Sequence, residues 1–174
     1  MSIRIVNHVY IADTARVLGD VTIAQDVNIW YGVSIRGDVA PITIGEQTNI
    51  QDNVVIHCDT GYPNHIGRRV SIGHGAVVHG ESVGDETLIG MHATVMGHVR
   101  IGKRCVIAAG AVVPPGLQVP DGMMVMGVPG RVIRPVNKKE QDYLDLLPDR
   151  YLNLAKRHHE SPDAPTVRPF GCDG

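Results

Sequence analysis

Aromatic side chains are scarce in this chain: only 4% of its 174 residues are Phe, Trp or Tyr, although 43% are hydrophobic. A core built from large aromatic rings is therefore excluded. The chain instead carries 20 glycines, and its hydrophobic residues are dominated by Val and Ile. Small, β-branched residues combined with many glycines favour a regular β structure with tight turns.

Other absences narrow the classes of function. The formal net charge is −2 and no basic run is present, so nucleic acid is not expected as a partner. No apolar run approaches the ~20 residues that span a bilayer, and the first ten residues lack a signal-peptide core, so no membrane partner is expected. The three cysteines, Cys58, Cys105 and Cys172, have no paired spacing. This pattern favours a reducing, cytoplasmic location.

A six-residue repeat runs through most of the chain, and it predicts the fold. Seventeen aliphatic residues keep this spacing apart from three shifts of register: Ile11, Val17, Ile23, Ile29, Ile35, Ile44, Ile50, Ile56, Ile66, Ile72, Val78, Val83, Ile89, Val95, Ile101, Ile107 and Val113. Such a pattern resembles the hexapeptide repeat of left-handed parallel β-helices, in which three hexads form one triangular coil. We therefore expect an all-β solenoid, a left-handed parallel β-helix, followed by a C-terminal α-helix.

The repeat also predicts the boundaries of the parts. Residues 1–136 are expected to form the β-helix, with the segment 118–136 capping its end. Asn137 is a predicted N-cap, with Glu140 three residues later in a capping box. A helical segment is expected over 137–160, interrupted or restarted at Pro148 and packed on the β-helix through its apolar face. Residues 161–174 are expected to form an extended tail.

Two histidines occupy equivalent positions on successive coils. If Ile44, Ile50 and Ile56 begin the three faces of one coil, then the next three hexads begin the same faces one coil later. His57 and His79 then both follow an inward aliphatic residue on the same face, and their side chains point outward. They are expected to be neighbours at the inter-strand spacing of ~4.8 Å, a suitable separation for two ligands of one zinc ion.

His74 belongs to a different face, so it is poorly placed to join His57 and His79 within one column. A second column packed against that face would supply it. Three such neutral nitrogen ligands leave a fourth tetrahedral position for water, which is typical of a catalytic zinc site. Of the other histidines, His65 lies in a loop extruded between His57 and Ile66 and is a candidate proton relay; the rest are interpreted as surface residues.

The motifs IRGD (35–38), NIQD (49–52), VIH (55–57) and IGHGAVVHG (72–80) resemble those of the gamma-class carbonic anhydrases and their bacterial relatives. The resemblance implies a homotrimer that binds zinc, sometimes iron or cobalt, between subunits through His57, His74 and His79. It also implies reversible hydration of CO2 to bicarbonate by a metal-bound hydroxide.

The same resemblance assigns further residues. Gln51 matches the residue that orients the hydroxide, and Arg36 with Asp38 matches an inter-subunit ion pair. Asp52 and Asn49 match supporting positions. Tyr151, on the apolar helix face, resembles a tyrosine that reaches toward the metal pocket, while Asn153 is the alternative polar residue on nearly the opposite face.

The sequence departs from the archaeal pattern at the positions that serve proton transfer. Val39 follows Asp38 where a glutamate is expected, and the loop after His57 contains Asp59 but no glutamate. CO2 hydration must export a proton in each turnover, so a slow enzyme is one expectation. Two alternatives stay open: a hexapeptide acyl-CoA transferase or thioesterase-like enzyme, and a non-catalytic metal-binding scaffold trimer.

Overall fold

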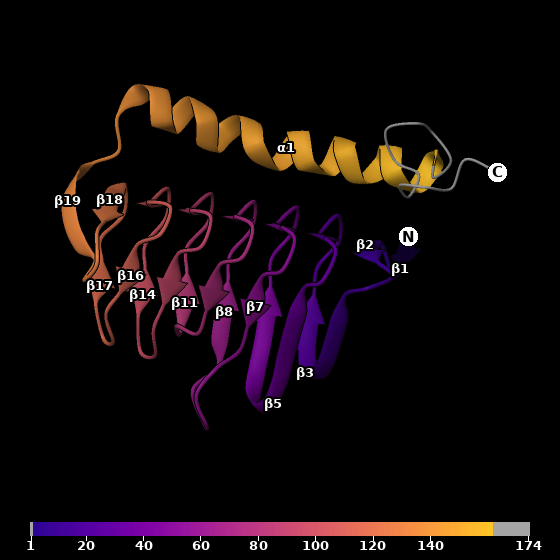
Figure 1. Cartoon of the computed structure of the whole chain (residues 1–174), viewed down its shortest axis with the longest axis horizontal. Coiled ribbons are helices and arrows are strands. Elements are labelled where there is room, and N and C mark those ends of the chain that lie inside the picture. The colour runs from indigo at the N-terminus through magenta and orange to yellow at the C-terminus, as the bar shows by residue number, and fades with distance from the viewer. Residues whose placement is uncertain (1, 162–174) are drawn as a thin grey trace.

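The protein is a column of stacked β coils with one long helix lying along its side (Figure 1). The computed structural model describes residues 2–161. The predicted tail therefore lies outside the described residues from position 162 onward, as does Cys172. In the described part, Cys58 and Cys105 are buried free thiols.

Two sheets form the wall of the column. The first contains, in spatial order, β1 (Ile3–Val6), β2 (Val9–Ala12), β4 (Asn28–Ile29), β6 (Asn49–Ile50), β9 (Ser71–Ile72), β12 (Leu88–Ile89), β15 (Val106–Ile107), β18 (Met123–Met126) and β19 (Arg131–Pro135). The second contains β16 (Val112–Val113), β13 (Thr94–Val95), β10 (Val77–Val78), β7 (Val55–Ile56), β5 (Ser34–Ile44), β8 (Asn64–Ile66), β11 (Ser82–Val83), β14 (Arg100–Ile101) and β17 (Gln118–Val119), and β3 (Arg16–Ile23) pairs with β5. The second sheet covers two faces because β5 continues through a corner, pairing with β7 near its start and with β8 near its end.

The strand register confirms the predicted face assignment. Ile44 pairs with Ile66, Ile50 with Ile72, and Ile56 with Val78, each one coil later in a parallel ladder. The repeating aliphatic side chains point into the column, where most are fully buried. The interior is therefore one continuous stack of β-branched residues, and each coil buries its aliphatics against its neighbours.

The corners of the coils require left-handed backbone conformations, and several charged or polar residues adopt them. His92 and His98 have φ values of +55° and +60°, and Glu86 and Arg104 occupy similar turns. This conformation costs less for His and Asn than for β-branched residues. Turn geometry thus accounts for the placement of His92 and His98 at these corners.

Antiparallel hairpins close both ends of the first sheet. β1 pairs with β2 at the N-terminal end, and β18 pairs with β19 at the other. The β18–β19 hairpin lies within the segment that was predicted to cap the column. These hairpins replace the parallel ladder where the hexad pattern is absent.

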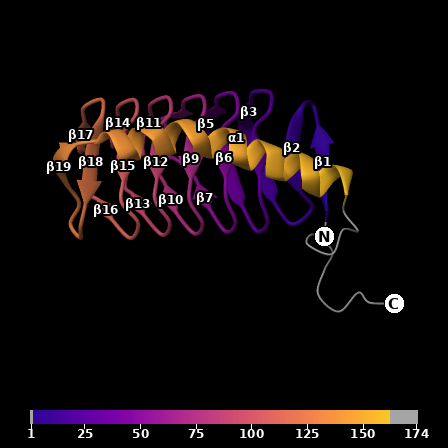
Figure 2. The ribbon, with the colours of Figure 1, turned by 90° about the horizontal axis from the view of Figure 1, so that it is seen from above.

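The helix α1 (Lys138–Glu160) crosses the coils of the first sheet, as the view from above shows (Figure 2). Asn137 accepts from the Glu140 N–H and the Glu140 side chain accepts from the Asn137 N–H, which confirms the predicted capping box. The predicted interruption at Pro148 is wrong, because the helix is continuous through it. Pro148 and Leu147 are buried, so packing against the sheet holds the helix on both sides of the missing N–H donor.

None of the described helical residues form a segment long and apolar enough to cross a membrane.

Acidification is expected to weaken the start of α1. Hydrogen bonds from Arg134, together with those from Asn137, hold the pKa of Glu140 at about 2, against an ordinary value of 4.5. Because the folded-state pKa is lowered, this stabilisation is present above pH 4.5 and is lost as the pH falls toward 2. Glu140→Gln keeps an oxygen for the Asn137 N–H but loses the charge that pairs with Arg134, so it should lower the free energy of unfolding at pH 7 by about 1 kcal/mol, the upper end for an exposed ion pair.

Thermal unfolding followed by circular dichroism would check this expectation. The melting temperatures of the wild type and Glu140→Gln should converge as the pH approaches 2. Glu160→Gln removes the same charge at the far end of the helix and serves as the control. A Glu140→Gln deficit that stayed constant from pH 7 to pH 2 would contradict the ionic explanation.

Candidate metal centre

His57 and His79 lie side by side on successive coils. The parallel register pairs Val55 with Val77 and Ile56 with Val78, so the two histidines follow in equivalent positions. Their ring centroids are 5.2 Å apart and the rings are tilted by 48°. The prediction that these two side chains are stacked neighbours is therefore confirmed.

A carboxylate contacts each of these imidazoles. His57 Nε2 lies 3.0 Å from Asp38 Oδ1, and His79 Nε2 lies 3.0 Å from Asp59 Oδ1. Asp38 is also bound by Arg36, whose hydrogen bond lowers the Asp38 pKa, with a further contribution from His57. The pKa of Asp59 is lowered first by its hydrogen bond from His79. Both carboxylates are therefore ionised at neutral pH, and each orients one imidazole.

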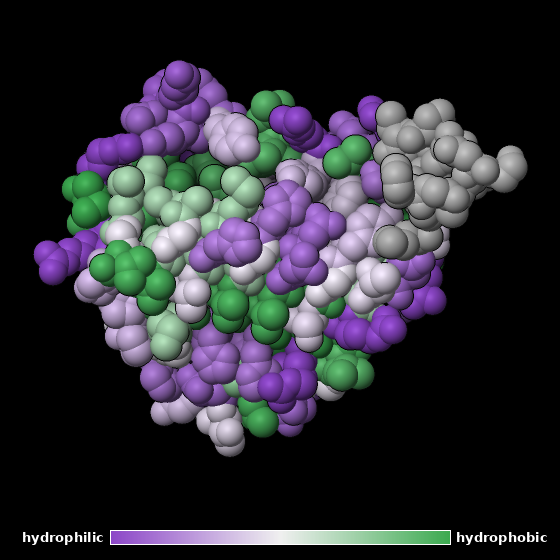
Figure 3. Space-filling view, in the orientation of Figure 1, coloured by the Kyte–Doolittle hydropathy of each residue, from purple (hydrophilic) through white to green (hydrophobic). Residues whose placement is uncertain are grey.

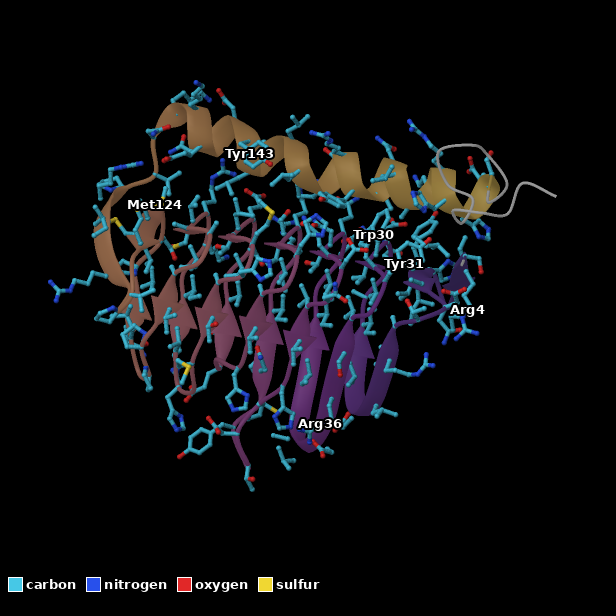
Figure 4. The ribbon with its side chains drawn as sticks, viewed as in Figure 1. Arg4, Trp30, Tyr31, Arg36, Met124 and Tyr143 are labelled. Carbon is cyan, nitrogen blue, oxygen red and sulfur yellow. The ribbon has the colours of Figure 1, made fainter. Side chains whose placement is uncertain are left out.

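The predicted ion pair of Arg36 and Asp38 forms within one chain. Arg36 precedes His57 by one coil, because Ile35 pairs with Ile56. Figure 4 shows Arg36 at the corner of the coil farthest from α1. The His57–His79 pair and its carboxylates therefore occupy the side of the column that the helix leaves uncovered.

His74 lies on another face and has its own partners. Its Nδ1 is 2.8 Å from Asp52 Oδ2, and its Nε2 is 3.3 Å from the Tyr151 hydroxyl. Burial raises the pKa of Tyr151 most, so its hydroxyl stays protonated at neutral pH. A carboxylate on one ring nitrogen is the usual support of a metal-binding histidine, because it fixes the tautomer and frees the other nitrogen.

Gln51 is held in a buried network beneath the helix. Its Nε2 donates to Asn49 Oδ1 at 3.0 Å, and its Oε1 accepts from the His74 N–H at 3.3 Å. Asn49 in turn donates to Ser71 Oγ at 2.7 Å. The orientation of the Gln51 amide is therefore fixed. Gln51 and His74 both line a hollow of 440 Å³ between the helix and the first sheet.

The hollow beside His74 is flanked by aromatic residues that sequence reasoning missed. The Trp30 ring lies between α1 and the coils (Figure 4) and packs edge-on against Tyr151, with centroids 5.8 Å apart. Trp30 also packs against His158, which lies 3.2 Å from the Tyr31 hydroxyl. Trp30 follows Ile29 as Gln51 follows Ile50, so its position in the hexad could have predicted that it lies on the same face as Gln51. Asn153, the alternative to Tyr151, is exposed.

Within residues 2–161, no single chain gathers three or more potential ligand side chains into one metal-binding group. His74 follows β9 of the first sheet, whereas His57 and His79 follow β7 and β10 of the second, so His74 lies on another face, as the hexad spacing predicts. The donor chemistry nevertheless fits a metal such as zinc: two neighbouring imidazoles lie on one face, and a third has carboxylate support on another.

Comparisons with known proteins support the six-residue repeat and identify related sequences along most of the chain. The family model described as "Bacterial transferase hexapeptide (six repeats)" matches residues 82–115. A probable carbonic anhydrase from Methanocaldococcus jannaschii is 45% identical over 149 residues, covering 86% of this chain and 94% of the relative. Mitochondrial gamma carbonic anhydrase 1 from Arabidopsis thaliana is 40% identical over 86% of this chain, which spans 56% of the length of the plant protein.

Among solved structures, a hexapeptide transferase family protein from Anaplasma phagocytophilum superposes with a TM-score of 0.82. It is 35% identical in sequence, and the match covers 86% of this chain and 89% of that one. The chain is thus similar in sequence to proteins named carbonic anhydrases and similar in fold to a protein named for the hexapeptide transferase family.

Proposed function

Because the chain belongs to the gamma carbonic anhydrase family, we propose that it catalyses the reversible hydration of CO2 to bicarbonate at a metal site shared between copies of the chain. The observation that carries this proposal is the division of the histidines: a stacked pair, His57 and His79, on one face and a carboxylate-supported His74 on another. Each copy then provides two ligands to one site and the third ligand to another site. In a closed ring of copies every site has all three ligands.

A homotrimer is the assembly we propose. The strands that carry His57 and His79 also present Val55 and Val77 outward, and Val55 is 40% exposed. Figure 3 shows apolar patches among the polar residues on one side of the molecule. Contiguous exposed apolar surface is typical of an interface. If the face that carries Val55 and Val77 packed against the His74 face of a second copy, the two valines would be buried and the three imidazoles would come together.

His57, His74 and His79 would hold the metal, with zinc as the expected ion and iron or cobalt as alternatives. When bound, such an ion supplies a Lewis acid that lowers the pKa of water to near neutrality. Asp52 holds the tautomer of His74 in which Nδ1 donates and Nε2 is unprotonated, and the Tyr151 hydroxyl that contacts Nε2 would move aside when this atom ligates a metal.

The remaining site residues position and bind the reactants. Asn49 fixes the Gln51 amide, so that Gln51 Oε1 is available to accept a hydrogen bond from the reacting water. Arg36 neutralises Asp38 and offers its other N–H groups to the bicarbonate product. The Tyr151 hydroxyl, beside His74, provides a further donor in the hollow that Gln51 lines.

Three measurements on one purified sample test this proposal. Sedimentation should give a mass of three chains, elemental analysis should give one metal ion per chain, and stopped-flow assays should show CO2 hydration that chelation abolishes. A single-chain mass in solution would exclude the shared site. One metal ion per chain without hydration in any buffer would favour the non-catalytic scaffold.

The buried free thiols fit the expected cytoplasmic location.

An acyl-CoA transferase is the second candidate, and the likeness to hexapeptide transferases favours it. Arg150 lines the hollow beside His74 and would offer its positive charge to the phosphates of a coenzyme A thioester. Calorimetric titration with acetyl-CoA distinguishes the two candidates. We expect no binding of acetyl-CoA to the metal-loaded protein. Binding with micromolar affinity would favour the transferase function over CO2 hydration.

A further inference from the structure

Asp59 separates the His57–His79 pair from a second group of polar side chains. One of its oxygens contacts His79, and the other lies directly over Gly97 of a later coil, where a Cβ atom would collide with it. Gly97 therefore lets the Asp59 carboxylate lie against the turn that carries His98. The charge of His98 lowers the pKa of Asp59, after the larger contribution of the His79 hydrogen bond.

His98 is held in one orientation. Its Nδ1 lies 3.0 Å from Glu81 Oε1, and its ring packs edge-on against Tyr62 with centroids 4.4 Å apart. Glu81 is itself fixed by Arg100, whose Nη2 lies 2.6 Å from Glu81 Oε2. The carboxylate partner favours the tautomer in which Nδ1 carries the proton. Nε2 then has the free lone pair.

The nitrogen of His98 that does not contact Glu81 belongs to a side chain that is partly exposed to water. The His98 side chain is 47% exposed, and Nε2 has no hydrogen-bond partner among the residues that the structure describes. A hollow of 330 Å³, lined by Tyr62, His65, Glu81 and Arg100 among others, adjoins the residues that contact His98 and has room for ordered water. His98 is therefore partly exposed to solvent, and its turn lies against the Asp59 carboxylate, which contacts His79 of the candidate metal centre.

CO2 hydration releases one proton for each bicarbonate formed, and this proton has to leave the site in every turnover. Imidazole is the side chain suited to accepting and releasing protons near neutral pH. The groups that face His98 support a transient positive charge: Asp59 and Glu81 are anionic, and Arg100, which opposes them, is already paired with Glu81.

We propose that His98 is the proton-transfer residue of this chain. It accepts the released proton at Nε2 and passes it to buffer or water, returning to the neutral form with no net change of charge. This inference rests on the proposed hydration activity. His65, which the sequence suggested for this task, lines the same hollow, but its Nδ1 is bound by the Thr43 hydroxyl, and its strand pairs with those of Thr43 and Ser82 rather than with those that precede His57 and His79.

The test uses His98→Asn, because asparagine tolerates the +60° φ of this turn but does not titrate. His92→Asn is the matched control: it occupies an equivalent left-handed turn, with φ of +55°. In dilute buffer, His98→Asn should lower kcat at least about tenfold while leaving kcat/KM unchanged, because proton export follows bicarbonate formation. Concentrated imidazole should restore kcat, and His92→Asn should match the wild type throughout.

A second readout does not depend on the metal or on turnover. Imidazole ¹⁵N shifts of the metal-free protein, assigned through their loss in His98→Asn, should show protonated Nδ1 and unprotonated Nε2 at alkaline pH. The opposite tautomer would overturn the proposal, as would unchanged kcat in dilute buffer or a deficit that imidazole does not restore. A wild type inactive in every buffer would instead refute the hydration activity, and the role of His98 with it.

Discussion

His74→Ala is expected to remove the metal from the assembled protein and to lower CO2 hydration by at least about 100-fold. Loss of a residue that merely supports a ligand already costs 10- to 100-fold, so loss of the ligand itself should cost more. The side chain is 42% exposed and lies outside the column, so its removal leaves the stack of coils intact. The metal should therefore be lost without unfolding, as elemental analysis and circular dichroism can show together.

The control for this experiment is His8→Asn. His8 lies in the turn between β1 and β2 with φ of +65°, so asparagine fits there and the number of histidines falls equally. Full metal content and activity are expected in this variant. If His74→Ala also retained its full metal content, ligation between subunits through His74 would be refuted. Neither of the other two proposed ligands, His57 and His79, lies on the face that carries His74.

Gly84→Ala is expected to destabilise the protein by about 3 kcal/mol, at the upper end of the cost of overpacking. A Cβ atom at Gly84 would lie 2.5 Å from the carbonyl carbon of Gly102 in the next coil. Gly45 and Gly67 meet the following coil in the same way, so this corner is a column of glycines. Backbone from two coils occupies the space, and neither coil can move without disturbing its ladder.

Gly61→Ala separates this steric effect from backbone strain. Gly61 has a φ of +78°, but nothing lies within 4 Å of its Cβ position. This substitution should therefore cost only the ~1 kcal/mol of placing alanine in a left-handed conformation. Urea denaturation of both variants gives the comparison. Equal losses of stability would show that the coils do not need close approach at Gly84.

The hexad spacing alone predicts most of the architecture. A six-residue period with inward aliphatics leaves few ways to arrange the coils, so the pairing of Ile56 with Val78 followed from counting. The same count placed His57 next to His79. Outward residues at equivalent positions on neighbouring coils must be neighbours, whatever their chemistry.

The contacts between corners and loops could not be predicted in this way. Asp59 reaches His79 because it lies in a loop that interrupts the repeat. The path of that loop cannot be predicted from the six-residue spacing. Pro148 was expected to break the helix because local propensity ignores the sheet against which the helix packs. His98 was interpreted as a surface residue for the same reason, because its proximity to Asp59 depends on the path of that loop.

The position of α1 also affects how the column comes apart. A solenoid whose coils contact only their neighbours tends to fray from its ends. Here α1 contacts β1, β2, β4, β6 and β9, and its Leu144 packs with Val106 and Met124 near the opposite end. Close to its last turn, His159 lies 3.1 Å from the Ile3 carbonyl oxygen. Opening either end must therefore disturb the helix that braces the other, so the coils are expected to unfold as one cooperative unit rather than to unzip in sequence.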